Sequence, residues 1–202
     1  MTLWRGPKVL ILASQSSARK MLLANAGIEF EAVPADIDER AIQQNSNIAA
    51  PDKIAGLLAR EKALWISRRW AGQYVIGADQ TLALGNRLFN KPGSRAAAAE
   101  QIRAMSGQTH TLHSAIAVAL DDKIIFETIA VARMTVRHLS SDDIEAYLDA
   151  AGDAVTQTVS AYQLEGLGVH LFERIEGDHF TILGLPLLPL LSFLRSQNLL
   201  AL

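Results

Sequence analysis

The stretch LASQSSARK, residues 12–20, decides how the N-terminal part of this chain folds. Residues 9–13, which overlap its start, form an apolar run typical of a buried strand, and residues 18–26, which overlap its end, have the composition of a helix. Amides at a helix N-terminus are unpaired and carry partial positive charge, so they attract phosphate oxygens. Arg19 and Lys20 would lie in the first helical turn, where a cation is unfavourable unless an anion is bound there. A polyphosphate site is therefore one interpretation. A helix capped by Ser17, with both cations solvated, is the other and simpler one.

Length and composition indicate an ordinary globular chain. Its 202 residues are 50% hydrophobic and 20% charged, so we predict one domain over residues 1–202, built of two lobes. The absence of cysteine excludes disulfides and zinc–thiolate sites and suits a reducing cytoplasm, where we place the protein. The net charge of −2 argues against a nucleic-acid partner. Residues 1–7 are too short for a signal peptide, and the apolar run 182–194 is too interrupted to span a membrane.

Residue patterns predict mixed strands and helices, which argues for an α/β fold with a mixed sheet. Beyond the first strand and helix, strands are predicted at residues 29–34, 74–84, 87–89, 112–120, 124–136, 169–175 and 180–183. Helices are predicted over residues 51–70 and 187–198, and after caps at Ser94 and at Ser140 or Ser141. Gly85-Asn86 and Asp121-Asp122 are expected to form hairpin turns.

Asp79 is the unusual residue of the second informative stretch, VIGADQTLAL, residues 75–84. An aspartate in so apolar a strand carries a large desolvation cost unless it is paired, metal-bound or at the strand end. Gly77 and Ala78 keep the backbone before it open to close approach. A carboxylate that binds a divalent cation, activates water, or does both is favoured over one that caps a turn or pairs with a lysine.

Other charged residues leave two interpretations open. Lys91, fixed before a proline, could reach a phosphate or simply belong to a surface loop. Lys62 lies in a helical pattern among small and apolar neighbours, so it faces either the site or solvent. The acidic clusters at residues 36–40 and 176–178 are either Mg²⁺ ligands or polar loops. The five histidines show no i,i+4 metal spacing, and no Walker A or G-x-G-x-x-G motif is present.

Taken together, these stretches resemble the Maf family of nucleoside triphosphate pyrophosphatases over nearly the whole chain. The resemblance rests on an ordered set of motifs: LASQSSARK (12–20), DIDE (36–39), REKA (60–63), IGADQ (76–80), KP (91–92), SGQTH (106–110), GLG (166–168), IEGD (175–178) and GLP (184–186). It implies a Maf/ITPase-like α/β fold, with a mixed twisted sheet, flanking helices and two lobes around a deep cleft. It also implies hydrolysis of a nucleoside triphosphate to the monophosphate and pyrophosphate with Mg²⁺ or Mn²⁺, in a homodimer that removes modified nucleotides.

The same resemblance implies roles for individual residues. Asp79 would be the proton acceptor, and Glu39 and Asp79 would place the metal ion. Lys62 and Lys91 would be catalytic through their hold on the phosphates, whose developing negative charge cations stabilise. The other expected substrate contacts in the first motif are Ser14, Ser16, Ala18, Arg19 and Lys20.

Three positions distinguish the family's members by base, and here they are Ala18, Gln80 and Glu165. Members acting on dTTP and UTP typically have Arg, Thr and Gln there, so this chain is more similar to the subgroup that hydrolyses 7-methyl-GTP. One carboxylate accepts both N1–H and N2–H₂ of guanine and favours the positive charge of the methylated base. Glu165 facing solvent, with broad specificity, is the alternative, and Ala18 would widen the pocket. The competing functions are a dTTP/UTP pyrophosphatase and a non-catalytic regulator of septum formation.

Overall fold

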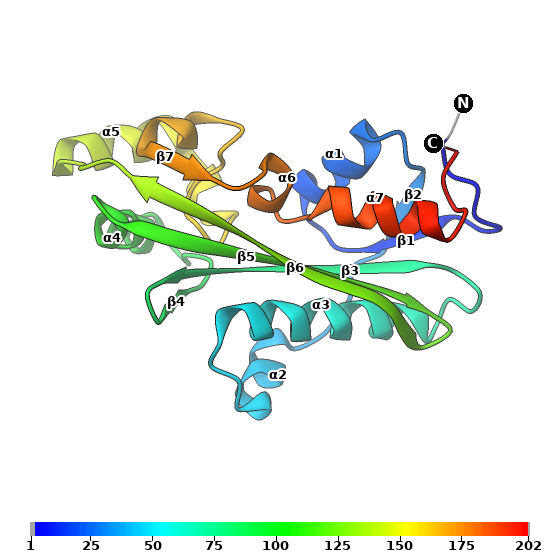
Figure 1. Ribbon diagram of the computed structural model, residues 1–202. Coiled ribbons are helices and arrows are strands. Elements are labelled where there is room, and N and C mark those ends of the chain that lie inside the picture. The colour runs from blue at the N-terminus through cyan, green and yellow to red at the C-terminus, as the bar shows by residue number, and fades with distance from the viewer. Residues whose placement is uncertain (1–2, 202) are drawn as a thin grey trace. The chain divides into compact units, whose positions relative to one another are not determined.

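The fold is an α/β arrangement around one mixed seven-stranded sheet, as predicted (Figure 1). The computed structural model describes residues 3–201. The sheet order is β2-β1-β3-β5-β6-β7, with β4 paired to β3. The strands are β1 (Leu10–Ala13), β2 (Phe30–Ala32), β3 (Val75–Leu84), β4 (Arg87–Phe89), β5 (Thr109–Leu120), β6 (Lys123–Val136) and β7 (Phe172–Glu176). The helices are α1 (Ser17–Asn25), α2 (Glu39–Ser46), α3 (Pro51–Ser67), α4 (Arg95–Met105), α5 (Ser141–Ala151), α6 (His179–Ile182) and α7 (Leu187–Ser196), with 3₁₀ turns η1 (Gly152–Thr156) and η2 (Leu167–Leu171).

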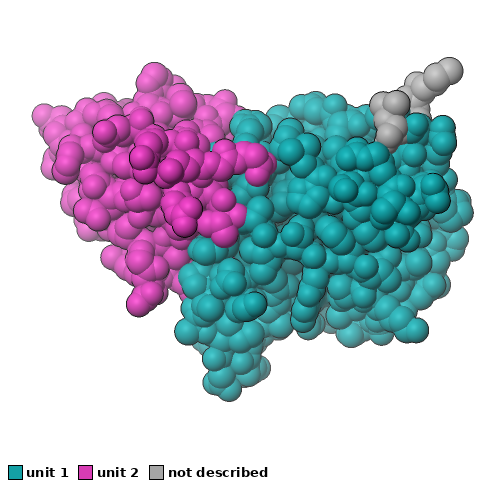
Figure 2. All heavy atoms as spheres, in the orientation of Figure 1, with its two compact units in different colours: residues 1–80, 113–130, 179–202 teal, residues 81–112, 131–178 magenta. Residues whose placement is uncertain are grey.

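The chain forms two compact units, coloured separately in Figure 2. Unit 1 comprises Met1–Gln80, His113–Ala130 and His179–Leu202, and unit 2 comprises Thr81–Leu112 and Val131–Asp178. Within unit 1 the first and last segments are joined, because Trp4 bridges Leu200 and the Arg5 amide donates to the Leu199 carbonyl at 2.9 Å. A single domain with a deep cleft stays a prediction. No helix within residues 3–201 is long and apolar enough to cross a membrane.

Parallel strands β2, β1 and β3 form the centre of unit 1. All four residues of β1 are buried, which is typical of a parallel strand covered on both faces. Figure 1 shows α1 and α7 on one face and α3 on the other. Leu10, Leu12 and Ile76 pack in the apolar cluster on the α1–α7 face, whereas Ile11 and Ile66 pack on the α3 face.

Gly77 allows α3 to lie directly against β3. A Cβ atom at this position would lie 2.0 Å from the Ala59 carbonyl oxygen and 2.9 Å from the Ala63 Cβ, so only glycine fits. Because strand side chains alternate between faces, Asp79 lies on the same face as Gly77. The predicted close approach at Gly77 is therefore confirmed, and it brings Lys62 of α3 next to Asp79.

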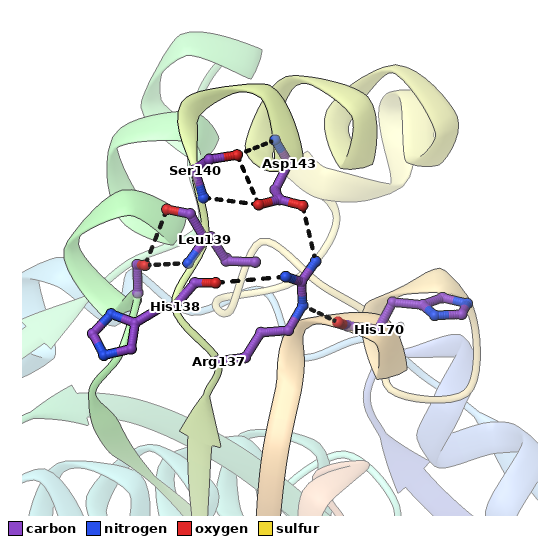
Figure 3. A network of polar contacts seen from close by, with 7 residues as sticks. Arg137, His138, Leu139, Ser140, Asp143 and His170 are labelled. Atoms are coloured by element: carbon purple, nitrogen blue, oxygen red, sulfur yellow. Dashed lines mark hydrogen bonds and ion pairs between the residues drawn. The ribbon is translucent and has the colours of Figure 1, made fainter.

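A polar network at the start of α5 organises unit 2 (Figure 3). Ser140 is the N-cap and forms a capping box with Asp143, whose amide donates to the Ser140 hydroxyl at 3.1 Å. Asp143 Oδ2 accepts from the Ser140 amide at 2.9 Å, and its Oδ1 accepts from Arg137 Nη2 at 3.2 Å. Arg137 Nε also donates to the His170 carbonyl at 3.0 Å. Of the two predicted caps, the structure selects Ser140.

Several sequence predictions were wrong in kind or position. Residues 180–183 do not form a strand, because residues 179–182 make the short helix α6; so short an apolar run has no distinguishing period. Residues 169–171 belong to η2, and the strand begins only at Phe172. Helix α2 was not predicted, since it buries none of its residues and so has no apolar stripe. The cap of α1 is Ser16, whose side chain accepts from the Arg19 amide, not Ser17.

Candidate active site

The candidate site of unit 1 lies where its parallel strands end. Residues 14–20 follow β1 and residues 36–39 follow β2, while β3 continues beyond its last pairing with β1, Ala13 opposite Gly77. Asp79 and Gln80 lie two and three residues after Gly77 in β3. Because the carboxyl ends of parallel strands meet at one edge, these three segments converge there, as in other open α/β sheets.

Lys62 bridges two carboxylates at this edge. Its Nζ atom lies 2.6 Å from Asp79 Oδ1 and 2.8 Å from Glu39 Oε1. The side chains of Lys62 and Asp79 are each only 10% exposed, whereas Glu39 is half-exposed. Lys62 therefore faces these carboxylates rather than solvent, and Asp79 pairs with a lysine, which was one of its two alternatives. Desolvation offsets much of the attraction in such a buried pair, so it is weak evidence for stability and better evidence for function.

Asp79 is held in an environment that favours proton uptake. Burial raises the pKa of Asp79 above its ordinary value, and the charges of Lys62 and Arg19 oppose that shift. A proton acceptor is most effective when its pKa lies close to the working pH, so a raised carboxylate pKa suits a general base. The geometry and the electrostatics of Asp79 are thus compatible with the predicted role.

Arg19 is fixed by backbone and side-chain acceptors. Its Nε donates to the Gly184 carbonyl at 2.8 Å, and its Nη1 donates to the Ala78 carbonyl at 2.8 Å and to Ser14 Oγ at 3.3 Å. Burial lowers the pKa of Arg19, while Asp79 and Glu39 oppose this, and an arginine keeps its charge at neutral pH. The Nη2 group of Arg19 makes no hydrogen bond to any residue within the described range 3–201.

Gln80 lies on the opposite face of β3 from Asp79 and is fixed by residues that the sequence interpretation missed. Its Nε2 donates to Ser114 Oγ at 2.8 Å, to the Ile182 carbonyl at 3.0 Å and to the Thr181 carbonyl at 3.1 Å. The only signal for Ser114 was a lone hydroxyl opening the apolar run 115–120. Two of the three acceptors are backbone atoms and leave no trace in the sequence.

The family model for Maf-like proteins matches residues 9–197. This chain belongs to the Maf-like family. It is 68% identical over 201 residues to a nucleoside triphosphate pyrophosphatase of Bradyrhizobium diazoefficiens and 64% identical over 202 residues to one of Nitrobacter hamburgensis, in each case over 100% of both chains. It is 51% identical over 188 residues to a 7-methyl-GTP pyrophosphatase of Rhizobium etli, covering 92% of this chain and 94% of the relative.

The residues of this Maf-like protein fit a divalent cation. Glu39 and Asp79 both reach the single ammonium group of Lys62, so one cation at this edge can also meet both carboxylates. Carboxylate oxygens suit Mg²⁺, which takes one or two of them and completes its shell with water and phosphate. No group of three or more His, Asp or Glu residues within 3–201 could hold a metal ion. Substrate oxygens or waters would therefore supply the other ligands.

The remaining predicted site residues of this Maf-like protein have varied surroundings. Ser16 caps α1, Ala18 packs against the apolar cluster of the α1–α7 face, and Lys20 is half-buried. Lys91 and Glu165 belong to unit 2, where both are exposed. Their contacts with a substrate stay predictions. In the acidic cluster at 176–178, Glu176 pairs with Arg174 at 2.9 Å.

Proposed function

We propose that this Maf-like protein hydrolyses 7-methyl-GTP to the monophosphate and pyrophosphate. Relatives that are 68% and 64% identical over their whole length are named nucleoside triphosphate pyrophosphatases, which is the broader activity. An enzyme with this activity is a hydrolase of acid anhydrides. The methylated substrate is the name of the relative at 51% identity. The observation that carries the hydrolytic chemistry is the buried Lys62–Asp79 pair next to Glu39, whereas the choice of base rests on that relative.

The geometry supports a division of labour in the hydrolytic step. Asp79, with its raised pKa, accepts the proton of the water that attacks the α-phosphorus. Lys62 orients the Asp79 carboxylate and, with Arg19 and Ser14, holds phosphate oxygens and stabilises the leaving pyrophosphate. A Mg²⁺ or Mn²⁺ ion held by Glu39 and Asp79 would acidify the water and polarise the phosphate. Lys20 and Lys91 are proposed as further phosphate contacts.

Base preference is assigned to Gln80 and Glu165, with Ala18 leaving room for the methylated purine. Guanine presents N1–H and N2–H₂ together, which a carboxylate accepts as a pair, whereas uracil and thymine present one N–H. The positive charge of 7-methylguanine adds an attraction to Glu165. Removal of modified nucleotides by a homodimer is the proposed cellular role.

Pyrophosphate release from 7-methyl-GTP, GTP, dTTP, UTP and CTP tests the proposal, with Mg²⁺ or Mn²⁺ and again with excess EDTA. The expected result is metal-dependent turnover with the highest kcat/KM for 7-methyl-GTP. A preference for dTTP or UTP would keep the enzyme class and reject the assigned base. No turnover on any nucleotide would reject the class and favour the non-catalytic alternative. Glu165→Gln is the matched specificity variant, and an unchanged preference would remove Glu165 from the pocket.

A further inference from the structure

The carboxamide of Gln80 has only one chemically permitted orientation. Three oxygen atoms surround its Nε2 at 2.8 to 3.1 Å: Ser114 Oγ and the carbonyls of Thr181 and Ile182. Two of these are carbonyls and can only accept. Ser114 Oγ is a donor elsewhere, because its own proton goes to the Thr181 carbonyl at 2.6 Å. Carbonyl oxygens cannot donate, so the amide nitrogen rather than the amide oxygen must occupy this position. Its two protons serve Ser114 Oγ at 2.8 Å and the Ile182 carbonyl at 3.0 Å, while the Thr181 carbonyl accepts the Ser114 proton.

The amide oxygen of Gln80, Oε1, remains available to accept a hydrogen bond from a ligand. Within the described residues Gln80 Oε1 accepts no hydrogen bond, and Gln80 itself is partly exposed. Gly184, whose φ is +88°, lies against both Gln80 and Arg19: a Cβ there would be 3.7 Å from Gln80 Cδ and 3.3 Å from Arg19 Nε. The open acceptor therefore neighbours the proposed phosphate-binding arginine.

We propose that Ser114 is a positioning residue for base recognition, which fixes Gln80 as a hydrogen-bond acceptor toward the nucleotide. This inference rests on the proposed function and adds a rule to it. Gln80 selects a base edge that presents an N–H group, such as N1–H or N2–H₂ of guanine, and disfavours an edge that presents only acceptors. Ser114 itself is fully buried and contacts no substrate. It acts together with the Thr181 and Ile182 carbonyls: it accepts one of the two NH₂ protons of Gln80 and so helps to hold the carboxamide with its oxygen toward the nucleotide.

Ser114→Ala and Ser114→Thr form the kinetic test. Loss of the hydroxyl removes the acceptor of one of the two Gln80 NH₂ protons, so Ser114→Ala should raise KM for 7-methyl-GTP about three- to tenfold with kcat nearly unchanged. Ser114→Thr keeps the hydroxyl and should restore KM. Inhibition by inorganic pyrophosphate, which has no base, should be equal in the wild type and both variants. An unchanged KM in Ser114→Ala, or an equal loss of pyrophosphate affinity, would overturn the positioning role.

Side-chain amide exchange tests the orientation without turnover. In protein labelled with ¹⁵N-glutamine, the Gln80 signal is the one absent from Gln80→Leu. Its NH₂ protons should exchange slowly in the wild type and roughly tenfold faster in Ser114→Ala. Fast exchange in the wild type would overturn the inference even if nucleotides are hydrolysed. Slow exchange in a protein that hydrolyses no nucleotide would instead reject the proposed function and the base rule with it, and leave only the fixed side chain.

Discussion

Asp79 in unit 1 and Asp143 in unit 2 each contact a cation, yet their pKa values move in opposite directions. Asp79 is buried beside Lys62, and burial outweighs the attraction, so its pKa rises. Asp143 is only partly buried; hydrogen bonds from Ser140, then from Arg137, lower its pKa to about 2. The first carboxylate is prepared to take up a proton and the second to remain charged. Burial and donor count, rather than the presence of a cation, therefore separate the catalytic candidate from the structural one.

Asp79→Asn should have the largest effect on this comparison. The amide cannot accept a proton, so kcat for pyrophosphate release is expected to fall about a thousandfold, within the range for loss of a general base. The fold should survive because Lys62 keeps its contact with Glu39. Circular dichroism and steady-state kinetics check both points. A kcat within threefold of wild type would end the assignment of Asp79.

Lys62→Met removes the cation beside Asp79 and leaves the one beside Asp143 in place, so it tests the effect of the cation on the buried carboxylate. Turnover at neutral pH should fall about a hundredfold, since a charge-stabilising donor is lost. In the wild type the charge of Lys62 opposes the upward shift of the Asp79 pKa, so loss of Lys62 should raise that pKa further. The acidic limb of the kcat–pH profile should then move to higher pH.

Lys62→Arg keeps the positive charge and is the matched control. Its acidic limb should stay close to the wild-type position. A limb that stays in place in Lys62→Met as well would show that Asp79 does not control the profile.

Asp143→Asn should have the smallest effect, on stability alone. Its native pKa of about 2 lies below the value of about 3.9 for an unfolded aspartate, so the charged form stabilises the folded state. This contribution is fully present above about pH 4 and is lost as the pH falls toward 2. Loss of the charged half of the capping box, with the N-cap Ser140 retained, should lower Tm by about 2 to 4 °C at pH 7 and by almost nothing near pH 2, with turnover unchanged. A Tm difference that persists at pH 2 would contradict the pKa shift.

Much of the fold could be predicted because its signals are local. Gly27 ends α1 with φ +70°, and Asp121 and Asp122, both with positive φ, form the tight turn between β5 and β6. Asp79 was recognisable because a carboxylate in an apolar strand conflicts with its surroundings. Helix α2 escaped prediction because a helix that is polar all round has no periodic signal.

The fine structure of the site depends on residues far apart in the chain. Gln80 meets Ser114 and Thr181 across separations of 34 and 101 residues, and Arg19 meets Gly184 across 165. Most of these acceptors are backbone carbonyls, whose position depends on the folded chain rather than on residue type. A sequence pattern therefore identified Gln80 and Arg19 as important without giving the partners that orient them.

The order in which the two units are synthesised follows from how the chain is divided between them. Unit 2 is complete once residue 178 has left the ribosome, although it begins only at Thr81. Unit 1 includes the first residues made but also needs the segment from His179, which supplies α7, Gly184 for Arg19, and the Leu200 bridge to Trp4. The charged centre on the α3 face thus forms in the earlier part of the chain, while the elements on the opposite face of the sheet arrive last. A nascent chain stalled before residue 179 would hold Asp79 and Lys62 without the carbonyls of Thr181, Ile182 and Gly184 that contact Gln80 and Arg19.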